Sequence, residues 1–345
     1  MKTRITFLAL LLFATLIVGK QAGAEEKTKE YYEAWTAGSV KALEISNKYG
    51  QVKVLNNRSD SVTINVIITV EAANESKADE LLGDINVSFK KSGTTVSAVT
   101  SLDNNFKSQR KFSIDYEINV PSDKNLTVSN KYGDTFVNKL NANGSFDIKY
   151  GSFSANELVA PENGTMKLDM AYGNGSIDEA GDFEAIIAYS PLSMDEVGNL
   201  KMESKYSQIS IDNAGETVID SKYDKFSFDN LKSLNLTSKY SHISIDKLSG
   251  NLKVESGYGS VKVDEIASDF GNIDITNSYG QIELGLDDAS YTVDASCSYC
   301  GISYPQDNFK GNRIKENNSS EINGTVGNGG GKVTIKSRYG DIKLK

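Results

Sequence analysis

One tyrosine recurs through the chain at a nearly constant interval, and this repeat constrains the fold more than any other feature. Ten of the tyrosines, from Tyr132 to Tyr299, follow one another at spacings of 17 to 22 residues. Tyr49 precedes this series, and Tyr339 follows Tyr299 by 40 residues, which leaves room for two repeats. The flanking sequence recurs too, as NKYG at 47–50 and 130–133 and as SKYS at 204–207 and 238–241. Such self-similarity is typical of proteins built from stacked structural units.

Apolar residues lie at fixed offsets from each tyrosine. Met202 precedes Tyr206 by four residues, and Ile209 and Ile211 follow it by three and five. Steps of two indicate strands with one buried face, and the step of three across the tyrosine indicates a bend. This parity places the tyrosine on the same face as the buried residues before it, and the frequent Gly after it would supply the bend's conformation. We expect burial of Ile209, Ile211, Phe226, Phe228, Ile243 and Ile245.

A unit of this size cannot bury its own apolar face, so it must stack on its neighbours. The sequence therefore predicts an all-β chain folded as a single-stranded parallel β-solenoid over residues 41–345, with coils of 17 to 22 residues. The tyrosine signature is missing from about 55–126, which we interpret as an excursion that caps or broadens the first coils. It holds two alternating strands, at 62–70 and 112–120, a short helix at 76–82 with a Ser N-cap, and strands at 85–89 and 94–100.

Residues 1–24 have the pattern of a secretory signal peptide. Basic Lys2 and Arg4 are followed by an apolar stretch at 7–18 and by Ala-Gly-Ala before Glu25. The apolar stretch is shorter than the roughly 20 residues that span a bilayer, and we expect no transmembrane span in the mature chain. Residues 25–40 form a charged lead-in, interpreted as a short helix or a loose segment. The localisation this predicts is exported: periplasm, outer surface or extracellular.

Charge and composition narrow the chemistry. The formal net charge is -9, and without the three basic residues of 1–24 it is -9 - 3 = -12, which disfavours a nucleic-acid partner. A single His (His242), which we interpret as an exposed bend residue, and two Cys leave no material for a His-rich metal site or a zinc cluster. No cofactor, metal site or catalytic residue is predicted.

The chain resembles a known bacterial family, the putative-adhesin β-strand-repeat proteins, which form a domain of unknown function. The resemblance rests on the export signal, on IDYEINVP at 114–121 leading into LTV at 126–128, and on coils such as YGSVKV at 258–263. It covers roughly residues 40–345. It implies an exported cell-envelope protein of adhesive or scaffolding type, and it assigns no catalytic residues.

The tyrosine column is the most distinctive candidate site. Stacked aromatic rings at a corner of the coil are one interpretation, since an in-register repeat places identical side chains next to each other. The alternative is an aromatic strip that binds a sugar or a peptide. The candidate binding ladder comprises Tyr172, Tyr189, Tyr206, Tyr223, Tyr240 and Tyr258.

Two charged columns accompany the tyrosines. A basic residue immediately before the tyrosine should face outward, at Lys48, Lys131, Lys149, Lys205, Lys222, Lys239 and Arg338. An aspartate six residues after it recurs at Asp178, Asp195, Asp212, Asp229, Asp246 and Asp264. These aspartates either hydrogen-bond local backbone in turns or are bridged by calcium, which needs six to eight oxygen ligands.

Cys297 and Cys300 flank Tyr299 in one coil. In an exported protein the leading interpretation is a disulfide across the bend. A thioredoxin-like redox pair is the alternative. Such a pair requires a helix N-terminus after the first Cys to lower the pKa of its thiol, whereas strands flank this pair.

Two classes of function remain at this point. The first is a non-enzymatic adhesin-like or scaffolding protein that binds an envelope polymer or partner protein through its repeat faces. The second is a carbohydrate-active enzyme, a polysaccharide lyase or hydrolase, which should interrupt the repeat with a loop carrying unlike catalytic groups. The long interruption at 301–331 is rich in Asn, Gly and Ser and is expected to be a flexible excursion. Self-association, as in the polymerising bactofilins, is a third alternative, because the sequence ends on the coil residues Ile342 and Leu344.

Overall fold

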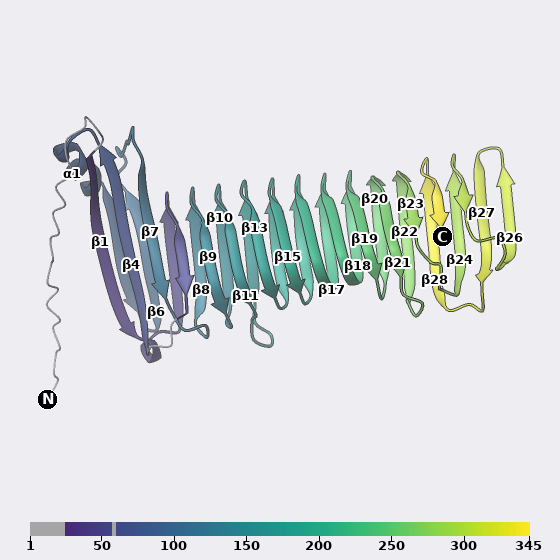
Figure 1. The fold of residues 1–345 in the computed structure, drawn as a ribbon, viewed down its shortest axis with the longest axis horizontal. Helices are drawn as coiled ribbons and strands as arrows, with labels where there is room; N and C mark the ends of the chain where they lie inside the picture. The colour runs from purple at the N-terminus through teal and green to yellow at the C-terminus, as the bar shows by residue number, and fades with distance from the viewer. Residues whose placement is uncertain (1–24, 57–59) are drawn as a thin grey trace.

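Short strands stack side by side along a rod (Figure 1). The computed structural model describes residues 25–56 and 60–345. The predicted signal peptide at 1–24 lies outside the described residues. The all-β prediction is confirmed, since one α-helix and one short 3-10 helix accompany the strands of the described part.

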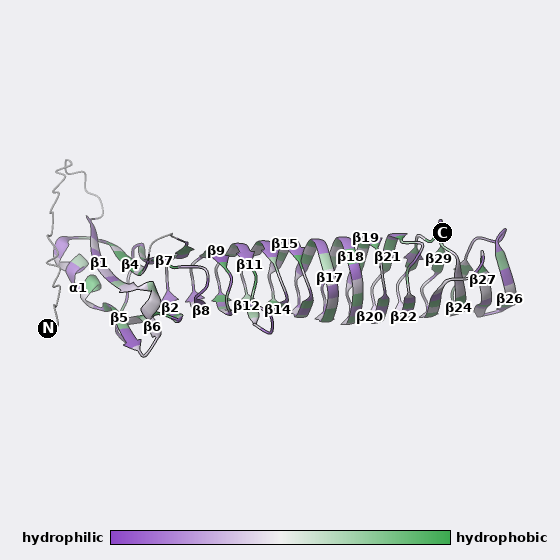
Figure 2. Cartoon of the chain, turned by 90° about the horizontal axis from the view of Figure 1, so that it is seen from below, coloured by the Kyte–Doolittle hydropathy of each residue, from purple (hydrophilic) through white to green (hydrophobic). Residues whose placement is uncertain are grey.

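Each coil contributes one strand to each of two opposite faces, which Figure 2 shows on the two sides of the rod. Face A holds the strands before the tyrosines, in this order along the rod: β2 (Ala42–Lys48), β8 (Asn125–Lys131), β10 (Gly144–Lys149), β12 (Met166–Ala171), β14 (Phe183–Ala188), β16 (Leu200–Lys205), β20 (Leu252–Tyr258), β22 (Asn272–Tyr279), β28 (Gly331–Arg338) and β24 (Tyr291–Ser298).

Face B holds the strands after the tyrosines, in the same order: β3 (Val52–Leu55), β9 (Thr135–Leu140), β11 (Phe153–Leu158), β13 (Gly175–Ala180), β15 (Pro191–Val197), β19 (His242–Leu248), β21 (Val261–Ile266), β23 (Ile282–Leu284), β29 (Ile342–Leu344) and β25 (Ile302–Ser303). Two long strands, β17 (Gln208–Lys222) and β18 (Lys225–Lys239), run from face B of one coil onto face A of the next.

The core lies between the two faces and follows the predicted register. Ile209 pairs with Phe226, which pairs with Ile243, and the next inward positions pair in the same way. All six residues predicted to be buried are at most 2% exposed, which confirms the prediction. Identical spacing between coils therefore places apolar side chains of one coil directly against those of the next.

The N-terminal end is built from the excursion. A coil made of β6 (Thr95–Leu102) and β7 (Phe112–Asn119) lies outside the coil of β2 and β3, and it runs parallel to that coil. Antiparallel strands extend it: β4 (Ser61–Ala72) beside β7, β1 (Glu25–Thr36) beside β4, and β5 (Ile85–Ser92) beside β6. The helices are η1 (Ala37–Ser39) and α1 (Glu75–Gly83), and α1 packs on β1 and β4.

Two local expectations were wrong at this end. Residues 25–36 are neither helical nor loose, because their backbone pairs with β4 over twelve residues. The helix has Asn74 as its N-cap instead of Ser76, and the Asn74 side chain accepts a hydrogen bond from the Lys77 N–H at 2.9 Å. Asn and Ser cap helices about equally well, so the sequence did not separate the two.

The C-terminal end departs from chain order. The coil of β28 and β29, last in the sequence, lies between the coil of β22 and β23 and the coil of β24 and β25. The expected flexible excursion instead forms β26 (Phe309–Glu316) and β27 (Ser319–Val326), an antiparallel hairpin beside β24. Figure 1 shows the C-terminus inside the row of strands, with β24, β27 and β26 beyond it.

The purely parallel solenoid predicted from the sequence is therefore correct in part. The coils run parallel throughout the middle, whereas both ends add antiparallel pairs and make the sheet mixed. The repeat signature reports how coils stack on one another, and it carries no information about the strands that cover the ends. Among residues 25–56 and 60–345, no helix has the length and hydropathy that crossing a membrane requires.

Candidate functional site

Twelve tyrosine rings form one continuous stack along a corner of the rod, which we call the tyrosine ladder. Neighbouring ring centroids are 4.6 to 5.1 Å apart, and their planes differ by 1° to 15°. In spatial order the ladder comprises Tyr49, Tyr132, Tyr150, Tyr172, Tyr189, Tyr206, Tyr223, Tyr240, Tyr258, Tyr279, Tyr339 and Tyr299. The six tyrosines of the candidate binding ladder occupy its middle.

The ladder is exposed, which corrects the face expected from sequence parity. Exposed fractions run from 37% at Tyr49 to 54% at Tyr299. Ten of the twelve tyrosines have positive φ, between 52° and 65°. This left-handed conformation turns the chain at the tyrosine itself and directs the ring out of the coil. Counting residues in steps of two, which assumes extended backbone, therefore assigns the tyrosine to the wrong face. A bulky residue at positive φ is uncommon, and the stacking of each ring on its neighbours compensates for the cost.

Stacked rings present their edges to solvent, since each inner ring has a neighbour on both faces. A sugar that binds an aromatic strip needs a free ring face, because its C–H groups lie against the electron-rich face of the ring. Within the ladder that face is occupied. The exposed chemistry along the ladder is therefore a row of phenol edges and hydroxyl groups.

Beneath the ladder, five coils join the residue two before the tyrosine to the residue directly after the tyrosine, which closes the corner. In several coils the pair is Asn and Gly. The Asn130 Nδ2 donates to the carbonyl oxygens of both Gly50 and Gly133 at 3.0 Å, and so links two coils. The Asn277 Nδ2 makes the same two bonds, to Gly259 at 3.0 Å and to Gly280 at 2.9 Å.

Glycine is required at these corners by close approach between coils. A Cβ on Gly133 would lie 2.0 Å from the Gly50 carbonyl oxygen, and one on Gly173 would lie 1.9 Å from that of Gly151. The expectation that Gly supplies the bend's left-handed conformation holds at Gly259 and Gly280, where φ is 132° and 140°. In the other coils of the ladder the tyrosine itself adopts the left-handed conformation.

In the coils from 189 to 240 the corners carry Ser or Asp instead of Gly. The Ser221 and Ser241 hydroxyl oxygens lie 2.8 Å apart. Asp224 is 3% exposed and accepts hydrogen bonds from the Ser207 N–H at 2.6 Å and the Ser204 hydroxyl at 2.8 Å. Burial raises the pKa of the Asp224 carboxyl above its usual value, and these hydrogen bonds offset part of the shift.

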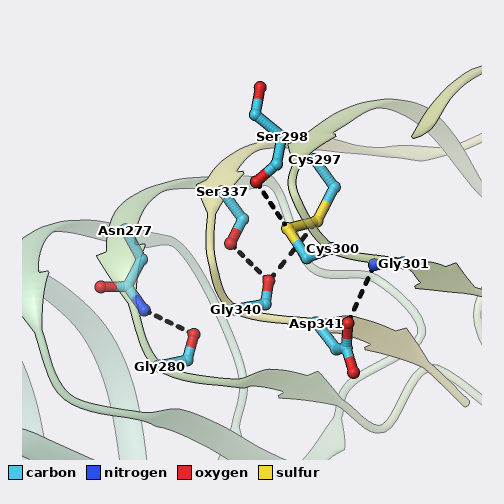
Figure 3. Close-up of a disulfide and its surroundings, with 9 residues drawn as sticks. All are labelled: Asn277, Gly280, Cys297, Ser298, Cys300, Gly301, Ser337, Gly340 and Asp341. Carbon is cyan, nitrogen blue, oxygen red and sulfur yellow. Dashed lines mark hydrogen bonds between the residues drawn. A yellow bond between two sulfur atoms is a disulfide. The ribbon is translucent and has the colours of Figure 1, made fainter. Parts of the chain in front are cut away.

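The two cysteines occupy the same pair of positions. Their sulphur atoms are bonded, with the Cα atoms 5.5 Å apart. In the adjacent coil the Ser337 hydroxyl donates to the Gly340 carbonyl at 2.6 Å, and in the next coil Asn277 bonds Gly280 (Figure 3). The disulfide is thus a covalent form of the corner closure that other coils make with hydrogen bonds.

Charged side chains line the ladder on face A. The basic column lies beside the rings: Arg338 stands 5.0 Å from the centroid of the Tyr339 ring and donates to its hydroxyl at 3.3 Å. Lys149 forms ion pairs with Asp147 and Asp169 on the same face. Its pKa is lowered by burial and raised by these carboxylates, and the net shift is upward.

The aspartate column is exposed on face B, but it lies within the strands and not where they end: two more residues of β15 follow Asp195, and Asp212 lies inside the long strand β17. Among the described residues, no group of three or more His, Cys, Asp or Glu side chains is arranged to hold a metal ion. Beside the aspartate column, the Asn213 side-chain amide donates to the Asp195 backbone carbonyl at 3.3 Å, and the Lys262 Nζ lies 2.7 Å from a carboxylate oxygen of Asp264.

A column of serines, which was not predicted from the sequence, lies between the ladder and the aspartates. It comprises Ser154, Ser176, Ser193, Ser210, Ser227 and Ser244, which lie in register on face B. Each serine follows a tyrosine by four residues, so the same counting would have found it. His242 is exposed at the edge of this face, where its Nδ1 lies 3.0 Å from the Ser260 hydroxyl.

Comparison with solved structures finds several bacterial proteins of low sequence identity. A "putative cell adhesion protein" from Clostridium sporogenes is 10% identical, with 92% of this chain and 99% of that chain covered and a TM-score of 0.25. A "putative lipid binding protein" from Parabacteroides distasonis is 12% identical, with 75% and 96% covered and a TM-score of 0.39. A "putative adhesin" from Parabacteroides merdae is 11% identical, with 69% and 96% covered and a TM-score of 0.37.

No curated protein matches the chain in sequence. The family model described as Toastrack DUF4097 matches residues 40–345, which is the whole region of tyrosine coils together with the excursion. The chain therefore belongs to the Toastrack DUF4097 family.

Proposed function

We propose that this chain is an exported, non-enzymatic binding protein of the bacterial cell envelope, adhesin-like or scaffolding, that contacts a polymer or a partner protein through its repeat faces. The observation that carries the proposal is the repetition of surface chemistry in columns. Tyrosine hydroxyls, basic residues, serines and aspartates each recur at one strand spacing over many coils. A repeating partner would meet the same contact many times, and weak contacts joined in this way give high avidity.

The alternative, a carbohydrate-active enzyme, would need an acid with a raised pKa that can reach substrate. Among residues 25–56 and 60–345, the carboxyl with a raised pKa is Asp224, and it lies under the ladder with its oxygens bonded to Ser204, Ser207 and the Lys222 N–H. That position favours a structural role for the group. The premise of the polymerising alternative also fails, because Ile342 and Leu344 are buried between coils instead of ending the rod.

The proposal is tested by a binding screen of the purified chain, residues 25–345, against envelope glycans and host matrix proteins. Hydrolase and lyase substrates are assayed in parallel. We expect saturable binding to at least one polymer and no release of reducing or unsaturated sugar ends. Turnover of any substrate would contradict the proposal.

Face-specific variants locate the contact. One variant changes face B by three substitutions, Ser210→Arg, Ser227→Arg and Ser244→Arg. A second variant changes face A by two, Asn235→Arg and Thr237→Arg. All five side chains face outward. Binding through one face predicts that one set weakens binding at least tenfold while the other leaves it within about twofold. Equal binding by both variants and wild type would mean that the faces are not used.

Export is tested on cells that express the full sequence. We expect the chain in the periplasm, at the surface or in the medium, with Glu25 as its first residue. An intact N-terminus on a cytoplasmic chain would contradict the proposed signal peptide.

A further inference from the structure

The two ends of the tyrosine ladder differ in what covers the last ring. At the N-terminal end, Phe112 packs against Tyr49 with centroids 5.1 Å apart, and Phe106 packs against Phe112 at 4.9 Å. The protein's own aromatic side chains therefore cover the outer face of Tyr49. Both phenylalanines come from the excursion that builds the end coil.

At the C-terminal end the last ring is Tyr299, because the coil of β28 and β29 is inserted before it. Tyr299 stacks on Tyr339 at 4.9 Å, and no other ring of the described residues contacts it. Its exposed fraction of 54% is the highest in the ladder. The outer face of this ring has no aromatic neighbour among the described residues, in contrast to the inner rings.

The backbone beside Tyr299 continues as if another coil followed. In most coils of the ladder the tyrosine N–H donates to the carbonyl of the residue before the next tyrosine, as Tyr206 donates to Lys222 at 3.0 Å and Tyr223 to Lys239 at 2.9 Å. The Tyr299 N–H donates to the Asn318 carbonyl at 2.6 Å. Asn318 belongs to the turn between β26 and β27, which runs antiparallel and supplies no tyrosine. The place where a thirteenth ring would stack is left without one.

An open cavity of about 640 Å³ lies at this place. It is lined by Tyr299 and by five polar residues, Ser298, Glu316, Asn317, Asn318 and Ser319. Hydroxyl, amide and carboxylate groups around one aromatic face match the surface of a pyranose ring, whose C–H groups prefer an aromatic face and whose hydroxyls need donors and acceptors.

We propose that this end cavity is a saccharide-binding site in which a sugar ring stacks on the outer face of Tyr299. This deepens the proposed function and rests on it, because it places a glycan contact at the tip of the rod. The polar lining disfavours a hydrophobic ring such as a Phe side chain. A second copy of the chain cannot continue the ladder head to tail, since Phe112 covers the other end.

The test uses residues 25–345 and four probes, the methyl glycosides of glucose, galactose, mannose and N-acetylglucosamine. Saturation-transfer NMR detects contact, and chemical-shift titration gives the affinity. We expect at least one glycoside to bind wild type, with its ring C–H protons receiving the strongest transfer. Tyr299→Leu should weaken binding at least tenfold, whereas Tyr299→Trp keeps a ring face and should retain it.

Matched variants separate this site from loss of fold. Tyr223→Leu removes a ring whose two faces are already stacked, and it should bind the glycoside as wild type does. Asn317→Ala changes a lining side chain in the hairpin turn and should weaken binding without changing the melting temperature. Equal loss in Tyr223→Leu and Tyr299→Leu would overturn the proposal.

Other occupants are distinguished in the same experiment. Tetramethylammonium and p-cresol serve as cation and aromatic probes, and sedimentation velocity measures dimerisation. Binding of either probe with no glycoside bound, or a dimer that Tyr299→Leu dissolves, would contradict the saccharide site. If no glycoside binds but a polymer still binds through face A or B, this proposal fails while the proposed function stands.

Discussion

The middle of the rod and its two ends follow different rules. From β12 to β22 each coil stacks on the coil that precedes it in sequence, and strand pairs are parallel. At the N-terminal end, the coil of β6 and β7 lies outside the earlier coil of β2 and β3. At the C-terminal end, the coil of β24 and β25 lies outside the later coil of β28 and β29.

This difference shows which problem each region solves. A middle coil needs neighbours of matching shape, and a repeated sequence supplies them. An end coil would expose a row of unpaired backbone groups and one side of the apolar core. In both ends a coil is capped by antiparallel strands, β4 and β1 at one end and β27 and β26 at the other. The outermost strand β1 carries four Glu and two Lys among its twelve residues, and such charges discourage pairing with another chain.

The largest expected effect compares a core residue of the middle with one of the inserted coil. Ile243→Ala should lower the free energy of unfolding by ~2 to 5 kcal/mol, as large-to-small core changes do. Ile342→Ala removes a side chain that is also fully buried, and it should cost a similar amount although only three residues follow it in the sequence. Chemical denaturation measures both.

Ile314→Ala is the control, because Ile314 is 51% exposed and should change stability by less than about 0.5 kcal/mol. If Ile342→Ala behaved like Ile314→Ala, the last coil would be frayed and the account of the C-terminal end would be wrong.

A second prediction contrasts the two kinds of corner. Gly173→Ala should cost about 1 to 3 kcal/mol, because its new Cβ would overlap the Gly151 carbonyl of the adjacent coil. Ser190→Ala loses the bond from the Gly173 N–H at 3.1 Å and should cost about 0.5 to 1.5 kcal/mol. Thermal unfolding measures the loss of stability in both variants, and we expect the larger loss in Gly173→Ala. A larger loss in Ser190→Ala would mean that the coils tolerate wider spacing at the glycine corners.

The disulfide should contribute less than a core residue. Replacing it by the hydrogen-bonded corner of the adjacent coil, with Cys297→Ser and Cys300→Gly, should cost about 2 kcal/mol or less, because a four-residue loop constrains the unfolded chain weakly. Thiol titration of the denatured, non-reduced protein should find no reactive thiol. Two thiols per chain would contradict the disulfide, and catalysed dithiol exchange would support the redox alternative.

The smallest effect is the pH dependence at Asp224. Because burial raises its pKa, the folded state binds the proton more tightly than the unfolded state does, so stability falls as pH rises through the folded pKa. Asp224→Ser, which matches the serine of neighbouring corners, should abolish this slope. Unfolding measured from pH 4 to pH 7 should show the variant gaining stability relative to wild type at the higher pH. Parallel curves would mean that Asp224 does not titrate as its burial indicates.

The strands, the buried positions and the stacking of coils in the middle of the rod could be predicted from the repeat. The apolar offsets around Tyr206 and Tyr240 correctly gave the strands, the buried positions and the stacking of coils. They gave the wrong exposure for the tyrosine, because parity assumes extended backbone through a residue that adopts positive φ. The serine column was present in the same count and was overlooked.

The order and pairing of the strands at the two ends of the rod could not be predicted from the repeat. The position of β28 between β22 and β24 depends on pairing between segments far apart in sequence, and the residue offsets around a single tyrosine carry no information about it. The strand β1 is rich in Glu and Lys, and it lacks the apolar alternation that marks a strand. The position of Tyr299 as the last ring of the ladder follows from this order of coils, so no local pattern could reveal it.

The order of the C-terminal coils is tested most directly by crosslinking cysteine pairs in a background with Cys297→Ser and Cys300→Ser. Thr276 and Lys336 are register partners on adjacent coils, and Ser296 is the partner of Lys336 on its other side. The account predicts that a reagent spanning about 5 Å, one strand spacing, joins Thr276→Cys to Lys336→Cys and leaves Thr276→Cys and Ser296→Cys unlinked. Efficient linkage of 276 to 296 would place the coils in chain order, make Tyr339 the end of the ladder, and contradict the account.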